Sequence, residues 1–418
     1  MTLERPELFD RRSLGVFLLA MLLVASFSLL RLYGNYLELK RFDTAQLDMQ
    51  VLSHQIKTNK NKTYGLLKLH QDNLTLYTRV SKHYRNLQGR SIRVMFWPER
   101  ITFASYLGGT FVRSAVLKLY PDLDVKERLA RYIAAQHHNH DMGALYGALF
   151  FATPMHSTLR SKLSALGVSH LLAISGFHLG LLSAFVYGIL YWPYRLVQSR
   201  YFPWRHRNRD LFVLTLIVLG AYLLFLGWIP SLMRAFVMLL VGYVLYDRGI
   251  KVLSMQTLFL SVVLLLALWP MLFFSIGFWL SVAGVYYIFL FLMYVGGFSK
   301  LLQAVVLSFG VYVMMLPLAL YLFGTFSLWH PLSMVWTLLF TLFYPLSMLL
   351  HVIGWGAMLD VPILWMLEHV HAFGVALPFG ILALHVTLSL LALRYRVAFI
   401  LALALAIIIA IGAIKQVA

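Results

Sequence analysis

The chain has 418 residues, of which 61% are apolar and 12% are charged, and its mean hydropathy is +0.77. A soluble globular domain is about half apolar and a quarter charged, so this composition excludes one and indicates a polytopic α-helical membrane protein. Lys and Arg number 35 against 16 Asp and Glu, and the net charge of +19 indicates anionic partners such as nucleic acid or lipid headgroups. Because the chain has no cysteine, disulfides and thiolate metal sites are excluded.

The charges are unevenly distributed along the chain. Residues 1–141 hold 21 basic and 12 acidic residues, whereas residues 142–418 hold 14 basic residues and only four acidic ones. Proton-coupled transporters and cation pores generally need carboxylates inside the membrane. The scarcity of acidic residues in the second part therefore argues against both classes.

The N-terminal segment contains the first predicted membrane helix. Arg11 and Arg12 precede an apolar run of 17 residues, Leu14 to Leu30. Its length and the lack of an A-x-A cleavage site predict a retained helix within residues 1–33 rather than a cleaved signal peptide. The two arginines predict a cytoplasmic N-terminus.

Residues 40–120 predict a β-domain outside the cytoplasm, because they follow the first membrane helix. Apolar and polar residues alternate with period two in short segments that are separated by polar turns. Short strands in such close succession predict a small closed barrel of the OB type, with an SH3-like barrel as the alternative. The predicted strands are Asp48–Ile56, Tyr64–His70, Leu74–Val80 and Ser91–Phe96.

Basic and aromatic residues are interleaved through this β-domain. Proteins that bind single strands combine a basic groove with aromatic rings on which bases stack. We therefore predict DNA contacts from Lys57, Lys60, Lys62, Lys68, Arg79, Lys82, Arg85, Arg90 and Arg93, with Tyr64, Tyr77 and Tyr84 for the bases. The alternatives are that the rings form the barrel core and the cations are simply solvated, or that the basic surface faces lipid headgroups.

Residues 121–169 predict an amphipathic or interfacial helical segment. It contains His137, His138, His140 and Asp141, whose side chains are of the kinds that bind metal ions. Because no second cluster of ligands pairs with them, we expect a solvated loop and no metal site.

Residues 170–418 predict a multi-helix membrane domain. Successive apolar runs are each near the length of roughly 20 residues that spans a bilayer, and with the N-terminal helix they predict about 9 to 11 transmembrane helices. The short loop 194–210 carries five arginines and is predicted to be cytoplasmic.

The densest polar cluster in this apolar part is the string HLLAISGFHLG, from His170 to Gly180. Polar residues inside a membrane span are costly and usually face the protein interior or a water path. Ser175 and Gly176 could interrupt the helix, which is tolerated where the freed backbone groups line a cavity. A helix interface with satisfied histidines is equally compatible with the pattern.

This string resembles the HLLAISGLHVG signature of ComEC-type competence proteins, which are inner-membrane DNA-uptake channels. Residues 230–235, PSLMRA, resemble the family's PSxxRA element, and residues 277–281, GFWLS, resemble its GFQLS element with Trp279 where Gln is usual. Leu316-Pro317 and residues 323–327, FGTFS, follow in the family's order. The resemblance covers roughly residues 30–350.

The resemblance implies a channel that passes one DNA strand into the cell during natural transformation. The implied channel-lining residues are His170, Ser175, Gly176, His178, Arg234 and Ser281. The implied partners are double-stranded DNA outside, single-stranded DNA in transit, membrane lipids, a periplasmic DNA-binding protein and a cytoplasmic helicase-type ATPase. Many members end in a metallo-β-lactamase-like domain, but this sequence has no HxHxDH string, so we expect a short form with a separate nuclease.

Two other functions remain open from the sequence. The positive charge also suits a transporter of lipids or cell-wall precursors. The segment Ala173–Gly176 superficially resembles the GxSG motif of rhomboid serine proteases, but Ala173 replaces the leading Gly and no Gly-rich helix with a suitable histidine is evident. No phosphate-binding P-loop string is present either. We therefore expect no enzymatic activity and no cofactor.

Overall fold

The structure is a computed structural model that describes residues 11–417 apart from 60–61, 72–73, 82–83, 85, 173, 175, 228, 248–253 and 296–298. The chain forms two compact units. The sheet unit comprises the described residues up to His156 together with Val263–Ile276. The helical unit comprises Ser157–Val262 and the residues from Gly277 onward.

The sheet unit begins with the long apolar helix α1, Arg11–Lys40. In its apolar window no residue is buried, as expected of a helix whose side chains face lipid. Its last turns differ, because Leu32 and Tyr36 are buried in the core of the sheet unit and the Tyr36 hydroxyl donates to the carbonyl oxygen of Ile101 at 3.0 Å. The helix thus continues beyond the predicted end at residue 33 and packs onto the β-domain.

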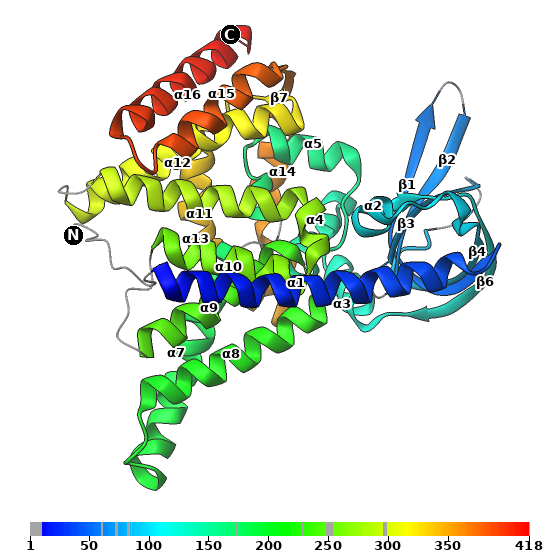
Figure 1. The fold of residues 1–418 in the computed structure, drawn as a ribbon, viewed down its shortest axis with the longest axis horizontal. Coiled ribbons are helices and arrows are strands. Elements are labelled where there is room, and N and C mark those ends of the chain that lie inside the picture. The colour runs from blue at the N-terminus through cyan, green and yellow to red at the C-terminus, as the bar shows by residue number, and fades with distance from the viewer. Residues whose placement is uncertain are drawn as a thin grey trace. The chain divides into compact units, whose positions relative to one another are not determined.

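The predicted strands are confirmed, and each is longer than the pattern indicated. They are β1 (Ala45–Asn59), β2 (Lys62–Gln71), β3 (Leu74–Ser81) and β4 (Arg90–Phe96). Figure 1 shows β1 and β2 as an extended hairpin. The short strand β5 (Thr110–Phe111) and the strand β6 (Ser114–Leu123) were not predicted.

The strands form an open sheet rather than the predicted closed barrel. The order in the sheet is β5-β3-β2-β1-β4-β6, so β5 and β6 are its edges. β5 pairs with β3 in parallel and β6 pairs with β4 in antiparallel fashion. Only Val112 and Arg113 separate these two edge strands along the chain. The Val112 amide donates to the carbonyl oxygen of Tyr77 at 2.9 Å.

One face of the sheet forms the core of this unit. Met49, Leu67, Leu76 and Ile92 are fully buried, and they alternate with exposed or half-buried residues on the same strands. This alternation is what period-two patterning produces in a sheet with one solvated face. The short helix α2 (Phe103–Gly108) and the end of α1 contribute to the same core.

The segment after the sheet is helical, as predicted. It forms α3 (Val125–Ala134), α4 (His140–Phe151) and, in the helical unit, α5 (Ser157–Ala165). The prediction of a solvated loop for the histidine tract is wrong in part, because His140 and Asp141 form the first turn of α4, where the Asn139 side chain accepts from the Asp141 amide at 2.7 Å.

The helical unit is built from apolar helices. They are α6 (Ser169–Leu172), α7 (Gly176–Tyr201), α8 (Arg207–Leu226), α9 (Pro230–Asp247), α10 (Met255–Leu268, shared with the sheet unit), α11 (Ile276–Tyr294), α12 (Lys300–Phe323), α13 (Ser333–Val352), α14 (Asp360–Glu368), α15 (Phe379–Leu391) and α16 (Arg396–Val417). In the described part of the chain, α1 and five of these are long and apolar enough to cross a membrane, and three shorter apolar helices accompany them. The protein is therefore a multi-pass membrane protein.

The apolar run 362–393 is not one helix. The nine residues of α14 extend over about 14 Å, which is well short of the roughly 30 Å of a hydrocarbon core. α15 is a separate helix that follows the strand β8 (Phe373–Gly374), which pairs with β7 (Thr325–Phe326). The number of crossings, about 9 to 11, thus stays a prediction.

Candidate functional site

The side chain of Arg234 is buried inside the helical unit, with 4% of the residue exposed. It lies in the second turn of α9, and its Nε donates to the Ser281 hydroxyl on α11 at 2.9 Å. Its Nη1 lies 2.7 Å from the sulfur of Met238. Among the described residues no carboxylate forms an ion pair with this guanidinium. A buried cation without a counter-ion is costly, so the site is electrostatically suited to an anion.

Gly176, the first residue of α7, lies beside this guanidinium. A Cβ atom at position 176 would lie 2.8 Å from Nη2 of Arg234 and 3.2 Å from Cβ of Ala235. Any other residue here would therefore force Arg234 or its helix to shift. Gly180, one turn further along α7, has nothing within 4 Å of the corresponding position.

The start of α9 is tied to the segment that precedes α7. The Ser231 hydroxyl donates to the carbonyl oxygen of Ile174 at 2.7 Å. This bond satisfies a carbonyl group between α6, which ends at Leu172, and α7. The first turns of α7 and α9 therefore lie together at Arg234, and the positive ends of both helix dipoles add to its charge. We call Ile174, Gly176, Ser231, Arg234 and Ser281 the Arg234 cluster.

The structure brings together some of the predicted channel residues and separates others. Gly176, Arg234 and Ser281 meet in the Arg234 cluster, although they come from three helices. His170 and His178 instead face α13: His170 Nε2 lies 3.1 Å from the Thr337 hydroxyl, and the buried His178 ring packs edge-on against two aromatic rings. Ser175 lies outside the described residues.

The structure also places two further residues of the motif strings, Ser231 and Trp279. Ser231 was not predicted, although it stands in the PSLMRA string that indicated Arg234. Trp279, which replaces the family's usual Gln, is 41% exposed on α11. Its neighbour Phe278 is fully buried in the same turn.

Aromatic and basic side chains gather on the outer surface of the sheet. Cross-strand pairing puts Lys57 opposite Tyr64, Lys68 opposite Tyr77, and Tyr77 opposite Phe111. Opposite residues share a face, and Arg79 shares it because it is two residues from Tyr77 on β3. We call Lys57, Tyr64, Lys68, Tyr77, Arg79 and Phe111 the basic face.

Cations and rings are in contact on this face. The Arg79 guanidinium carbon lies 4.6 Å from the centre of the Tyr64 ring and 5.3 Å from that of Phe111. Lys68 Nζ lies 5.9 Å from the centre of the Tyr77 ring. Each such contact contributes about 0.5–1 kcal/mol at an exposed site, so the rings hold the cations in place at the surface.

Arg93, a predicted DNA contact, is engaged within the sheet. It donates to both carboxylate oxygens of Asp48, at 2.8 and 2.7 Å, and Tyr120 donates to the same carboxylate at 3.1 Å. The hydrogen bond from Arg93 holds the pKa of Asp48 below its usual value, and the same bond raises the pKa of Arg93. The two charges neutralise each other over the whole physiological range.

The remaining predicted DNA contacts are dispersed. Arg90 is half-buried at the start of β4, and Tyr84 is 40% exposed after β3. Lys62 begins β2. Lys60, Lys82 and Arg85 lie outside the described residues.

Three histidines of the helical unit that a serine protease could use as a general base have other contacts. His385 Nε2 lies 3.0 Å from the carbonyl oxygen of Met314 and 3.2 Å from the Tyr287 hydroxyl, and all of its side chain is buried. His351 and His369 each contact the carbonyl oxygen four residues earlier on their own helices. These contacts hold helices together or extend helix ends.

The structure thus defines a class: a multi-pass membrane protein with a buried cationic cluster and a sheet unit that bears a basic face. The chain belongs to the Competence protein family, which residues 152–416 match, more than half of its length. This match confirms the resemblance and supports a role in DNA uptake during competence. No curated protein and no solved structure matches the chain.

Proposed function

We propose that this protein is the channel through which one strand of DNA crosses the bacterial inner membrane during natural transformation. The observation that carries the proposal is the Arg234 cluster, where a buried guanidinium that pairs with no carboxylate of the described residues meets two helix starts and the Ser281 hydroxyl. A path for a polyanion should offer guanidinium groups, hydroxyl groups and helix N-termini and should lack carboxylates. The few acidic residues after residue 142 agree with such a path.

We further propose that the sheet unit lies outside the cytoplasm, with the N-terminus inside, and binds incoming DNA through the basic face. OB-folds bind nucleic acid on the surface of their second and third strands, with cations for phosphates and rings for bases. The basic face occupies β1, β2, β3 and β5 and offers both kinds of group. The parallel pairing of β3 with β5, and the two-residue separation of β5 from β6, also favour an OB-like topology.

Transport of DNA in this direction needs an energy source. Moving an anion into a cell with a negative interior costs about 2.3 kcal/mol per charge per 100 mV. We propose that a cytoplasmic helicase-type ATPase pulls the strand, that a periplasmic protein delivers double-stranded DNA, and that a separate nuclease removes the other strand. In this scheme the chain itself catalyses no reaction.

The proposal is tested by locating DNA in cells that carry Arg234→Met. Cells of a deletion strain that express the wild-type chain or the variant are given fluorescent double-stranded DNA. We expect label in the cytoplasm with the wild-type chain and label arrested in the periplasm with Arg234→Met at equal membrane abundance. Arg234→Lys, which keeps the charge, should retain part of the entry. Normal cytoplasmic entry with Arg234→Met would contradict the channel.

A transporter of anionic lipids or cell-wall precursors would use the same positive charges. Three rings among the cations of the basic face favour single-stranded DNA, because bases stack on rings whereas headgroups do not. The two ligands can be compared directly by measuring binding of the detergent-solubilised chain to an oligonucleotide and to vesicles of anionic lipid. Preference for the vesicles, unaffected by removal of the rings, would favour the lipid transporter.

A further inference from the structure

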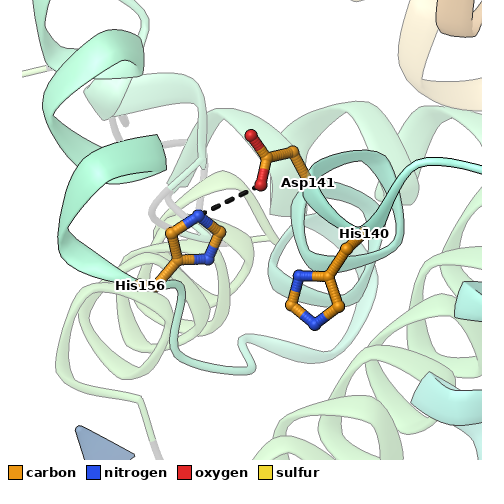
Figure 2. Close-up of side chains that lie close together, drawn as sticks. All are labelled: His140, Asp141 and His156. Carbon is orange, nitrogen blue, oxygen red and sulfur yellow. Dashed lines mark ion pairs between the residues drawn. The ribbon is translucent and has the colours of Figure 1, made fainter. Parts of the chain in front are cut away.

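Three side chains with metal-binding atoms converge at the start of α4 (Figure 2). His140 and Asp141 are its first two residues, and His156 follows after the helix has ended. His156 Nε2 lies 3.1 Å from an Asp141 carboxylate oxygen, and the ring centres of His140 and His156 are 5.9 Å apart. One potential ligand atom from each residue lies within 4.8 Å of the other two.

The path of the chain explains how residues at opposite ends of a helix meet. The 12 residues of α4 extend over about 18 Å. The four residues after Ala152, 153–156, can cover at most about 14 Å, and the side chains of His156 and Asp141 close the remaining gap to the helix start. Ala152 turns the chain with a left-handed φ of 53°. Gly147 permits the close return, since a Cβ there would lie 2.8 Å from the Thr153 hydroxyl oxygen.

The left-handed conformation of Ala152 has an energetic cost. A non-glycine residue in this region costs of order 1–3 kcal/mol, which other interactions must offset. The contact between His156 and Asp141 alone offsets little of this cost, because the two side chains are 38% and 34% exposed and partly exposed ion pairs contribute little. Capping hydrogen bonds from the Ala152 and Thr153 amides to the carbonyl oxygens of Ala148 and Gly147 offset part of the cost. A bond that joins all three side chains would add to that stabilisation.

We propose that His140, Asp141 and His156 bind a divalent transition-metal ion, with Zn²⁺ as the best match. Two imidazoles and one carboxylate are donors that suit Zn²⁺, whereas Ca²⁺ and Mg²⁺ prefer oxygen ligands throughout. In a tetrahedral Zn²⁺ site the ligand atoms lie roughly 3.4 Å apart. The Asp141–His156 distance of 3.1 Å is close to that value, and a rotation of the exposed His140 side chain would complete the set. Water would occupy the fourth position.

The ion would act as a structural link. It would close the loop from Asp141 to His156 and hold the returning segment 152–156 against α4. Closing a loop through a metal ion lowers the entropy of the unfolded chain. The site would therefore hold in place residues 152–156, which are the first residues of the family-matched region.

The test measures metal in the purified full-length chain. The protein is stripped with a chelator in detergent, dialysed against Zn²⁺ and analysed by elemental mass spectrometry, and Zn²⁺ affinity is measured by calorimetry. We expect one tightly bound ion per chain and a higher Tm with Zn²⁺. His156→Ala and His140→Ala should each lower the affinity by at least about 100-fold and remove the Tm increase.

His138→Ala is the matched control, because His138 is an exposed neighbour outside the cluster. It should keep both the ion and the Tm increase. Asp141→Asn is a milder second variant in case removal of a histidine impairs folding, and Co²⁺ absorption reports the ligand geometry independently. Absence of stoichiometric Zn²⁺ in the folded wild-type chain, or equal loss of the ion in His138→Ala, would overturn the proposal.

Discussion

The basic face and the Arg234 cluster present positive charge in opposite ways. On the sheet, several cations are exposed or half-buried and lie against aromatic rings. In the helical unit, the guanidinium of Arg234, a residue that is 4% exposed, contacts a hydroxyl and a thioether. Salt screens charges in water strongly and buried charges much less.

In the proposed function, this difference suits two tasks on the same DNA strand. Many exposed cations bind a nucleic acid by releasing counterions, and the complex dissociates readily when one contact after another is lost. One buried cation stabilises each phosphate only while that phosphate is beside it. We therefore expect capture at the basic face to depend on salt and on the number of cations, and passage at the Arg234 cluster to depend on one residue.

The largest effect is expected from Arg234→Met. A hydrogen bond to a charged group contributes about 1.5–3 kcal/mol, which corresponds to roughly 10- to 150-fold for each phosphate that passes. In the proposed channel every nucleotide meets this residue, so transformation frequency should fall to background at any salt concentration. Ser281→Ala, which removes only the hydroxyl group that accepts from Nε of Arg234, should cause a smaller loss of transformation frequency. An Arg234→Met strain that transforms normally would show that the strand takes another path.

A smaller but still large effect is expected from reversing the basic face. The triple variant Lys57→Glu/Lys68→Glu/Arg79→Glu should bind single-stranded DNA weakly, and the slope of its log K against log[salt] should be smaller in magnitude by about 2. Binding is measured as a salt titration with a fluorescent oligonucleotide.

The matched control for this variant is Arg100→Glu/Lys118→Glu/Arg128→Glu. It makes the same change of charge at exposed positions outside the basic face. Both variants should insert into the membrane like the wild-type chain. Equal weakening by the two triples would mean that overall charge, and not this face, binds DNA.

Gly176→Ala should have an intermediate effect on passage. The added methyl group would lie 2.8 Å from Arg234 Nη2 and must displace the guanidinium. Gly180→Ala is the matched control, because its methyl group meets nothing within 4 Å. Transformation frequency should fall several-fold only for the first variant. If both fall alike, the effect comes from the flexibility of α7 and not from Arg234.

The smallest effect is expected from Arg93→Gln. Asp48 neutralises Arg93, so its loss should change DNA affinity less than Lys57→Gln does. The pKa of Asp48 is held below its usual value, so the pair persists at neutral pH and separates only as the pH falls through that lowered pKa. Asp48→Asn should release Arg93 and strengthen DNA binding slightly at neutral pH. The double variant Arg93→Gln/Asp48→Asn should show no such gain in DNA affinity.

Local patterns predicted much of the sheet but not its edges. The alternation of Leu67, Lys68 and Leu69 assigns each residue to a face without further information. β5 has two residues and pairs in parallel, and β6 contains Pro121, so neither has a clear strand pattern. The open ends of the sheet follow from these two strands, which is why the closed barrel was wrongly predicted.

The candidate sites show the same limit. The motif strings pointed to Gly176, Arg234 and Ser281, but their meeting depends on how three helices pack. The Arg93–Asp48 pair depends on a register between strands 45 residues apart. His156 was overlooked as a partner of the histidine tract because nothing in the local pattern shows that the chain turns back along α4.

The length of α1 has a mechanical consequence. Its 30 residues extend over about 45 Å, roughly 15 Å more than a hydrocarbon core, and its last turns are embedded in the sheet unit. In the proposed arrangement, with α1 across the membrane, a continuous helix transmits both height and rotation, so the length of α1 would set the distance of the β-domain from the membrane and its orientation. One residue added to α1 would move the β-domain by about 1.5 Å along the helix axis and rotate it by about 100°. The direction in which the basic face points would thus depend on the length of α1.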